Sequence, residues 1–190
     1  MSLEHGFERF VEQPKPPFTD PVVSVDGNVV LCKYRPEDIP EAFALVDADR
    51  DRFSRKGIAA GIYLTSRRLM EGEYVNLNPK NNLNLAIRNR EHVYVGHLRL
   101  TRFMRNPDVG GLYYYLGAEH EGHGYMASAV RTVTDIALGE MGFDEVQGAV
   151  FPDNKKSGTV LEAAGFQKVE TKPDMLRFSR KRSDTEGPVL

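Results

Sequence analysis

Two glycines and two histidines lie close together in the run His120-Glu121-Gly122-His123-Gly124. A strand pattern precedes this run and a helix pattern follows it, so the glycines lie at a helix N-terminus. Free backbone N–H groups and the positive end of the helix dipole attract an anion there, and glycine lets the anion approach closely. A G-x-G turn alone is more often needed only for chain geometry. The run therefore indicates an anion site that other parts of the sequence must support.

Three other interpretations of this turn have less support. Residues 122–127 match the dinucleotide fingerprint G-x-G-x-x-A, but residues 117–121 separate them from the preceding strand, and too little chain follows for a doubly wound sheet. The histidines suggest a metal, but the zinc motif H-E-x-x-H is absent. A phosphate loop of the nucleotidase kind requires Gly-Lys-Ser/Thr, which the sequence lacks. We therefore expect no metal site. Nucleotide binding stays a hypothesis, ranked below the two functions that are derived below from the flanks of the turn.

The composition of the chain excludes several classes of partner. Lys plus Arg number 25 against 27 for Asp plus Glu, so no excess positive charge attracts a phosphate backbone, and we expect no nucleic-acid partner. No apolar run reaches the roughly 18 residues that a membrane span needs, and Met1–Lys15 lacks a signal-peptide pattern. The single cysteine, Cys32, excludes an intramolecular disulfide and fits a reducing compartment. These features predict a cytoplasmic protein without a membrane partner.

Hydrophobic periodicity predicts the elements that must position the turn. Residues 22–34 predict a hairpin with its turn at Asp26-Gly27-Asn28, and a helix begins after Pro36. Residues 47–80 show a helical pattern only around Ile62–Met70. The other predicted elements are strands at 83–87, 93–100 and 112–116, a helix at 124–141, a strand at 145–151, a helix at 156–164, and strands at 166–170 and 175–181.

This order of elements predicts an α+β fold in which helices cover a mixed, mostly antiparallel sheet. The length favours a single domain, which we place at residues 22–182. The proline-rich residues 1–21 predict an N-terminal arm, and residues 183–190 predict a frayed tail.

The flanks of the turn carry a more specific pattern than its glycines. The run Tyr114-Tyr115-Leu116-Gly117-Ala118-Glu119-His120-Glu121-Gly122-His123-Gly124-Tyr125-Met126 resembles the acyl-CoA loop of GCN5-related N-acetyltransferases (GNAT). It is most similar to the RimJ/RimL-like branch, which acetylates ribosomal-protein N-termini. The later runs Pro152-Asp153-Asn154-Lys155-Lys156-Ser157, Val160-Leu161-Glu162 and Gly165-Phe166 resemble the second signature of that branch. Two signatures in the right order are far more specific than one, and the resemblance covers about residues 22–182.

The resemblance implies a sheet that is splayed between two strands, with acetyl-CoA as cosubstrate in the gap. The strand end at 114–116 would pair with the pantetheine arm, and the backbone amides of 122–126 would hold the pyrophosphate. Asn154 would bind the pantetheine, and Ser157 would lie near the sulfur and protonate the departing thiolate. The implied cofactor residues are Tyr115, Leu116, Gly122, His123, Gly124, Tyr125, Met126, Asn154 and Ser157.

Three positions depart from the family pattern. Glu121 replaces the usual Gln or Arg, and a carboxylate repels a diphosphate unless it points away or its charge is compensated. Leu161 replaces a tyrosine that protonates the thiolate in many relatives. Ser128 replaces a frequent Glu, which we interpret as a change on the helix surface.

The expected activity is transfer of the acetyl group to a primary amine by direct attack in a ternary complex. The candidate bases are His97 on its predicted strand, Tyr115, Glu119 and Glu73, and we select His97 because histidine can take up a proton near neutral pH. The acceptor is a protein N-terminus or a small-molecule amine, and a homodimer is left open. The alternative function is a non-catalytic acyl-CoA-binding or sensing domain, which Glu121 and the missing tyrosine motivate.

Overall fold

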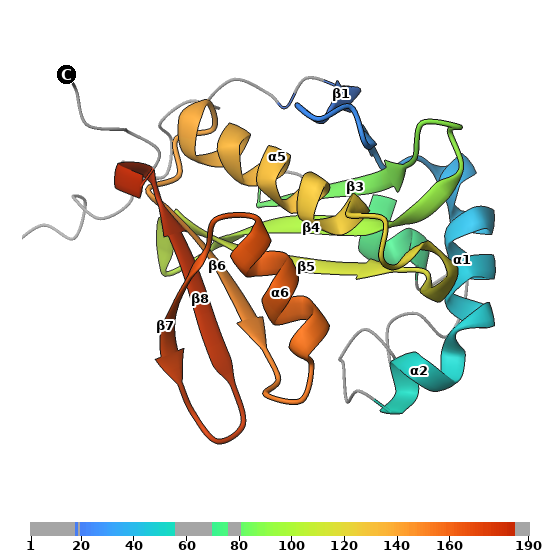
Figure 1. The fold of residues 1–190 in the computed structure, drawn as a ribbon. Helices are drawn as coiled ribbons and strands as arrows, with labels where there is room; N and C mark the ends of the chain where they lie inside the picture. The colour runs from blue at the N-terminus through green and yellow to red at the C-terminus, as the bar shows by residue number, and fades with distance from the viewer. Residues whose placement is uncertain (1–17, 19, 56–69, 76–80, 185–190) are drawn as a thin grey trace, which may run out of the picture.

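The structure is a computed structural model that describes residue 18 and residues 20–55, 70–75 and 81–184. Its centre is a mixed sheet with the strand order β1-β2-β3-β4-β5-β6-β8-β7, in which β5 and β6 pair in parallel (Figure 1). The strands are β1 (Val22–Val23), β2 (Val30–Lys33), β3 (Asn82–Arg88), β4 (Tyr94–Phe103), β5 (Asn106–Leu116), β6 (Glu145–Val150), β7 (Gln167–Thr171) and β8 (Leu176–Lys181). The other neighbouring pairs are antiparallel, so the predicted fold class is confirmed.

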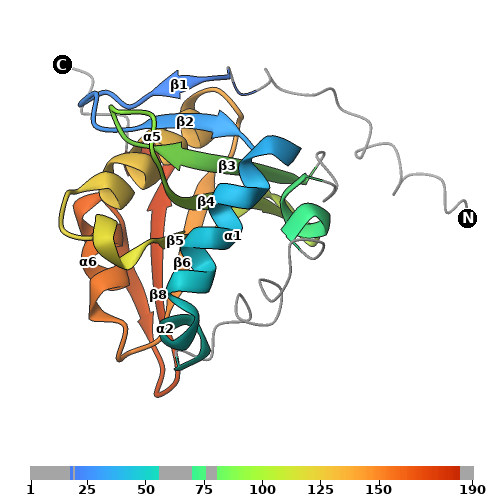
Figure 2. The same cartoon turned by 90° about the vertical axis from the view of Figure 1, so that its right-hand side faces the viewer.

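Helices cover both faces of this sheet. α5 (Tyr125–Gly139) and α6 (Lys155–Ala163) pack on one face, and α1 (Ile39–Ala48) packs on the other (Figures 1 and 2). α2 (Arg50–Arg55) follows α1 directly. The short helical turns are the 3-10 turns Pro36–Asp38, Ala118–His120 and Arg182–Asp184 and the π turn Glu71–Val75.

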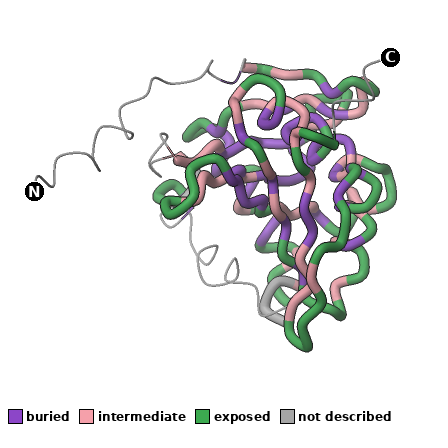
Figure 3. The backbone as a smooth tube through the Cα atoms, turned by 90° about the vertical axis from the view of Figure 1, so that its left-hand side faces the viewer, coloured by how far each residue is buried: buried purple, intermediate pink, exposed green. Residues whose placement is uncertain are grey.

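Each face of the sheet has its own hydrophobic core, because successive side chains of a strand point to opposite faces. On one face α5 buries Ala129, Val133 and Ala137, which recur at one-turn spacing. On the other face α1 buries Ala42 and Val46. The buried residues concentrate along the central strands (Figure 3). The sheet therefore separates two environments, and a group on one face does not contact the core of the other.

The parallel pair opens toward one end. β5 pairs with β6 only at Val109–Gly111, opposite Glu145–Gln147. Beyond this point β5 continues along β4 to Leu116, while β6 continues along β8 to Val150, and the two strands diverge (Figure 1). The predicted splay is confirmed. Beyond the split, the backbone N–H and C=O groups of β5 and β6 therefore do not pair with each other.

The predicted hairpin is confirmed, but two features differ from the expectation. β5 begins at Asn106 rather than residue 112, and its glycines conceal the strand pattern. A Cβ added to Gly110 would lie 3.1 Å from the Phe143 ring, and one added to Gly111 would lie 2.7 Å from the Phe103 ring. Small residues are needed here because aromatic rings fill the space. α2 lies in the stretch of unclear pattern, and the helical pattern around Ile62–Met70 falls, except for Met70, outside the described residues.

Part of the predicted N-terminal arm packs against the domain. The Phe18 side chain is only 5% exposed and joins the core beneath α5. Asp20 Oδ1 accepts a hydrogen bond of 2.8 Å from the Lys33 backbone N–H of β2. These two residues thus hold the chain before β1 onto the sheet edge.

Candidate functional site

The predicted anion turn lies where the chain leaves β5 and enters α5. Gly122 and Gly124 have φ angles of 81° and 76°, in the left-handed region that favours glycine. Gly124 is the N-cap of α5, and a glycine has no side chain that could cap this helix end. The first backbone N–H groups of α5 can therefore bind an anion. A Cβ added to Gly122 would meet no atom within 4 Å, so the turn faces open space.

The β1–β2 hairpin supports this turn from behind. Asn28 Nδ2 donates a hydrogen bond of 3.1 Å to the carbonyl oxygen of His123. The Asp26 carboxylate accepts hydrogen bonds from the hydroxyls of Ser128, at 2.6 Å, and Ser24, at 2.7 Å, and these bonds, with that of Ser128 the largest cause, lower the pKa of Asp26. Ser128 is only 6% exposed. Our interpretation of Ser128 as a change on the helix surface is therefore wrong, because this serine fastens α5 to the hairpin.

Glu121 lies between two cationic side chains. Its Oε1 is 2.6 Å from Nη1 of Arg52, and its Oε2 contacts Nζ of Lys156 at the start of α6. The sequence left two ways to reconcile a carboxylate with a nearby diphosphate, and the structure shows charge compensation. Glu121 therefore brings no unbalanced negative charge to the turn.

Arg52 also connects α2 to the end of β5. Its Nη2 donates hydrogen bonds of 2.6 Å to the carboxylate of Asp49 and to the carbonyl oxygen of Leu116. Asp49 in turn accepts a hydrogen bond of 2.7 Å from the backbone N–H of Ala118. The junction between α1 and α2 is thus bonded to the segment that leads from β5 into the glycine turn. A pantetheine amide that paired with the Leu116 carbonyl would have to share or displace the Arg52 contact.

The second signature forms the N-terminus of α6, beside the splay. Asn154 is the N-cap, and its Oδ1 accepts a hydrogen bond of 3.4 Å from the Ser157 backbone N–H. The Ser157 hydroxyl lies 2.8 Å from the phenol oxygen of Tyr114 on β5. Burial raises the pKa of Tyr114 to about 12, despite the opposing effect of this hydrogen bond. Leu161, further along α6, is fully buried in the core.

His97 lies on the opposite face of the sheet. It is 3% exposed, pairs with Tyr115 across β4 and β5, and stacks on the Tyr115 ring with centroids 5.6 Å apart. Burial, and secondarily the charge of Arg99, hold the pKa of His97 well below its ordinary value, so the ring is neutral at neutral pH. The Tyr115 hydroxyl is 2.9 Å from that of Tyr94, which contacts the hydroxyl of Tyr34. A row of three phenols therefore borders the buried histidine.

The predicted site residues gather around the open end of the β5–β6 pair, but on both faces of the sheet. The turn at Gly122–Met126 and the α6 residues Asn154 and Ser157 lie on the α5–α6 face, where Tyr114 packs. His97 and Tyr115 lie on the α1 face. The two candidate catalytic residues, Ser157 and His97, are thus on opposite sides of the sheet.

Several residues of this region were not assigned a role from the sequence. Tyr114 stood within the family run, and the alternation of side chains along a strand would have placed it on the opposite face from Tyr115. Arg52, Asp49 and Lys156 carried no comparable signal, because surface charges are ordinary on helices. Their importance emerges only from their contacts with the turn.

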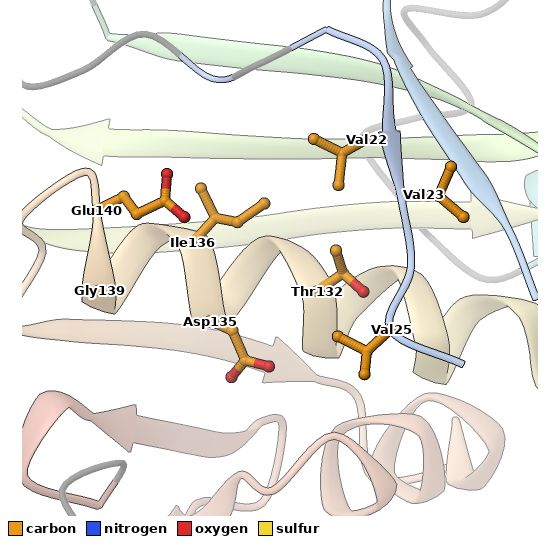
Figure 4. A pocket seen from close by; sticks show the side chains of 8 residues that line it. All are labelled: Val22, Val23, Val25, Thr132, Asp135, Ile136, Gly139 and Glu140. Atoms are coloured by element: carbon orange, nitrogen blue, oxygen red, sulfur yellow. The ribbon is translucent and has the colours of Figure 1, made fainter. Parts of the chain in front are cut away.

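The described residues also include a stacked histidine in the glycine turn and a pocket elsewhere on α5. The His123 ring stacks on Tyr125, with centroids 5.2 Å apart, and in the described part of the chain no three His, Cys, Asp or Glu side chains group as metal ligands. A pocket of about 370 Å³ lies between the hairpin valines, such as Val25, and the C-terminal half of α5, away from the glycine turn (Figure 4). Among the helices described, none has the length and apolar character to cross a membrane.

Comparison with known sequences gives a family. The sequence pattern of the family described as "Acetyltransferase (GNAT) domain" matches residues 28–167. The "Probable N-acetyltransferase YjcK" of Bacillus subtilis (strain 168) is 44% identical over 55 residues, which are 29% of this chain and 30% of that protein. The alignment thus spans less than a third of this relative.

Known structures share the fold. RimJ from Mycobacterium smegmatis, in complex with CoA-disulfide, has a TM-score of 0.73 and 16% identity, and the match covers 88% of each chain. The ribosomal-protein-S5-alanine acetyltransferase from Vibrio fischeri has a TM-score of 0.70 and 18% identity over 84% of this chain and 96% of that chain. Because the family pattern covers most of the sequence, including the glycine turn and the N-terminus of α6, this chain belongs to the GNAT acetyltransferase family.

Proposed function

We propose that this protein transfers the acetyl group of acetyl-CoA to a primary amine by direct attack in a ternary complex. The observation that carries the proposal is the splay between β5 and β6, which ends at an uncapped helix N-terminus with a glycine turn. This arrangement offers free strand edges to an amide-bearing arm and N–H groups to a diphosphate at its end. Ser157 lies beside the same opening.

This geometry supports the cofactor contacts that we propose. The backbone amides of Gly122–Met126 would bind the pyrophosphate, and the β5 edge at Tyr115 and Leu116 would pair with the pantetheine arm. Asn154 uses its Oδ1 to cap α6, and its Nδ2 would donate to a pantetheine carbonyl. Ser157 would face the sulfur. Together these contacts would hold one extended acetyl-CoA molecule along the opening between β5 and β6.

The reaction requires a neutral amine and a stabilised leaving group. The amine lone pair attacks the thioester carbon, the new C–N bond forms, and the C–S bond breaks with its electron pair remaining on sulfur. A thiol with a pKa near 8.5 is far more acidic than a serine hydroxyl, so the protonation of the thiolate by Ser157 that we expected from the sequence is unfavourable. Ser157 would instead stabilise the thiolate by donating a hydrogen bond. The thiolate then takes a proton from solvent.

The proton that leaves the amine needs an acceptor. His97 stays the proposed base, because its neutral ring can accept a proton, but burial and the charge of Arg99 lower its pKa and make it a weak base. Its burial requires that the amine approach alongside Tyr115. An α-amino group with a pKa near 8 depends less on such a base than a lysine-like amine near 10.4 does. A protein N-terminus is therefore the first acceptor to test, followed by small-molecule amines.

The deciding experiment is release of CoA thiol from acetyl-CoA in the presence of an acceptor panel. The panel contains peptides with free N-termini, polyamines, amino acids and aminoglycosides, and N-terminally acetylated peptides serve as the matched control. Thiol release that depends on a free amine supports the proposal. If acetyl-CoA binds in calorimetry but no acceptor raises release above background, the non-catalytic acyl-CoA-binding function is favoured instead. Tight NADH binding without CoA binding would favour the nucleotide hypothesis.

The proposed location of the protein is the cytoplasm. A single Cys32 fits a cytoplasmic location, where thiols stay reduced. Polypeptides and metabolites of the cytoplasm would then be its acceptors. Fractionation of cells that express the protein tests this location separately. A homodimer stays a prediction, and light scattering at several concentrations checks it.

A further inference from the structure

The side chain of Tyr114 joins the two walls of the opening. It extends from β5, and its hydroxyl lies 2.8 Å from the Ser157 hydroxyl and 3.3 Å from the Ser157 carbonyl oxygen, both at the first turn of α6. The two residues are 43 positions apart in sequence. Neither contact belongs to the hydrogen bonding of a helix or sheet. Tyr114 is thus the side chain that links the splayed strand to the proposed sulfur-binding serine.

The Tyr114 phenol is available as a hydrogen-bond donor to Ser157. Burial raises its pKa to about 12, so the phenol keeps its hydrogen, and in a contact between two hydroxyls either one can donate. Two oxygens of Ser157 can accept from the phenol, the hydroxyl at 2.8 Å and the carbonyl at 3.3 Å, and the hydroxyl is the closer. When Ser157 accepts this bond, its own hydrogen points away from the phenol. The Asn154 cap uses the backbone N–H of Ser157 and leaves the hydroxyl for other partners.

We propose that Tyr114 is a positioning residue for acyl transfer, whose phenol donates to the Ser157 hydroxyl and thereby directs the serine hydrogen toward the leaving sulfur. This inference rests on the proposed function and on the place of Ser157 beside the sulfur. The hydrogen bond also polarises the serine O–H group, which strengthens its own donation in a site of low dielectric. All protons stay on their oxygens in this step, and only the C–S electron pair moves to sulfur.

The test begins with Tyr114→Phe, which removes the hydroxyl and keeps the ring. We expect kcat to fall about tenfold, as for the loss of one hydrogen bond that acts on the transition state, with the KM for acetyl-CoA unchanged. Ser157→Ala should lower kcat at least as much. The double variant should be no slower than Ser157→Ala, because the phenol acts only through the serine. Tyr113→Phe is the matched control, since that neighbouring side chain is 59% exposed.

A second readout separates positioning from a purely structural role. The thiol of bound CoA is titrated by the ultraviolet absorbance of its thiolate, which needs no acceptor amine. Tyr114→Phe and Ser157→Ala should each raise the pKa of the bound thiol relative to the wild type, whereas Tyr113→Phe should not. A Tyr114→Phe protein with wild-type kcat and wild-type thiol pKa would overturn the inference, whatever happens to its melting temperature. Absence of CoA binding in the wild type would instead overturn the proposed function, and the positioning role with it.

Discussion

At the scale of single residues, the two cations beside Glu121 reverse the effect that Glu121→Arg would be expected to have on acetyl-CoA binding. A cation near a diphosphate ordinarily favours binding, so Glu121→Arg would be expected to improve the affinity for acetyl-CoA. In this protein the new cation would stand between Arg52 and Lys156. Like charges at such distances repel, and the link from the turn to α2 would be lost. The carboxylate is therefore part of the support of the turn.

We predict that Glu121→Arg weakens acetyl-CoA binding and lowers the free energy of unfolding by about 1 kcal/mol or more. Glu121→Gln, which restores the amide common in the family, should lie between this variant and the wild type. Calorimetric titration and urea unfolding measure the two effects. Tighter binding by Glu121→Arg at unchanged stability would contradict this role of the carboxylate.

Asn154 caps α6, and different substitutions separate this cap from its proposed contact with pantetheine. Asn154→Ala removes the cap of α6 and should cost about 1 kcal/mol of stability. Asn154→Asp keeps a capping oxygen but lacks the amide donor, so its stability should stay near that of the wild type while the KM for acetyl-CoA rises. Thermal melts and steady-state kinetics of both variants check this. An Asp variant with an unchanged KM would remove Asn154 from the pantetheine contacts.

At the scale of elements, the start of α5 depends on one backbone conformation. Gly124 has a left-handed φ, and a Cβ there would also lie 3.5 Å from the Asn28 amide that supports the turn. The hairpin and the helix end therefore meet at a residue without a side chain. The shape of the proposed anion site therefore depends on both the β1–β2 hairpin and the start of α5.

We predict that Gly124→Ala lowers the free energy of unfolding by about 1–2 kcal/mol and weakens acetyl-CoA binding. Gly139→Ala is the matched control, since Gly139 ends the same helix in ordinary geometry with no neighbour near its Cβ position. Alanine favours helix there, so the control should be neutral or stabilising by up to about 1 kcal/mol. Equal effects of the two substitutions in urea unfolding would argue against the special role of the turn.

At the scale of the whole molecule, the sheet places the proposed site residues on two faces. The glycine turn, Asn154 and Ser157 lie on the α5–α6 face, and the proposed base His97 lies with Tyr115 on the α1 face. Arg52 and Asp49 connect the α1–α2 junction to the segment after β5, so the two sides share a structural support. A change that disturbs α2 should consequently affect cofactor binding as well as acceptor binding.

The buried His97 makes the stability of the whole domain depend on pH. Its pKa is lower in the folded state than in the unfolded chain, so the unfolded chain takes up the proton first as the pH falls below about 6.5. Folding stability therefore decreases on acidification, by up to about 1.4 kcal/mol per pH unit for this one proton.

We predict that His97→Gln removes this component of the pH dependence between pH 6.5 and 5. Urea unfolding of both proteins across this range measures it. His92→Asn is the control, because His92 is exposed and its left-handed φ of 62° suits asparagine. If His97→Gln keeps the wild-type slope, another group is responsible for it.

The sequence alone determined the local chemistry and the order of the elements. The glycines at 122 and 124, the asparagine that caps α6 and the periodicity of α5 act over a few residues, so their consequences could be predicted from neighbouring residues. Together with the two family signatures, they predicted the splayed sheet. β5 was only partly predicted, because aromatic rings from elsewhere replace the side chains that its glycines lack.

The tertiary structure alone decided which charges and hydroxyls meet. Glu121 finds Arg52 across 69 positions, Ser128 finds Asp26 across 102, and Tyr114 finds Ser157 across 43. A side chain on a helix or strand carries no local mark of its distant partner, since that partner depends on how the elements pack. The glycine turn was therefore identifiable from the sequence. The neutralisation of Glu121 and the hydrogen bond between Tyr114 and Ser157 could be found only from the fold.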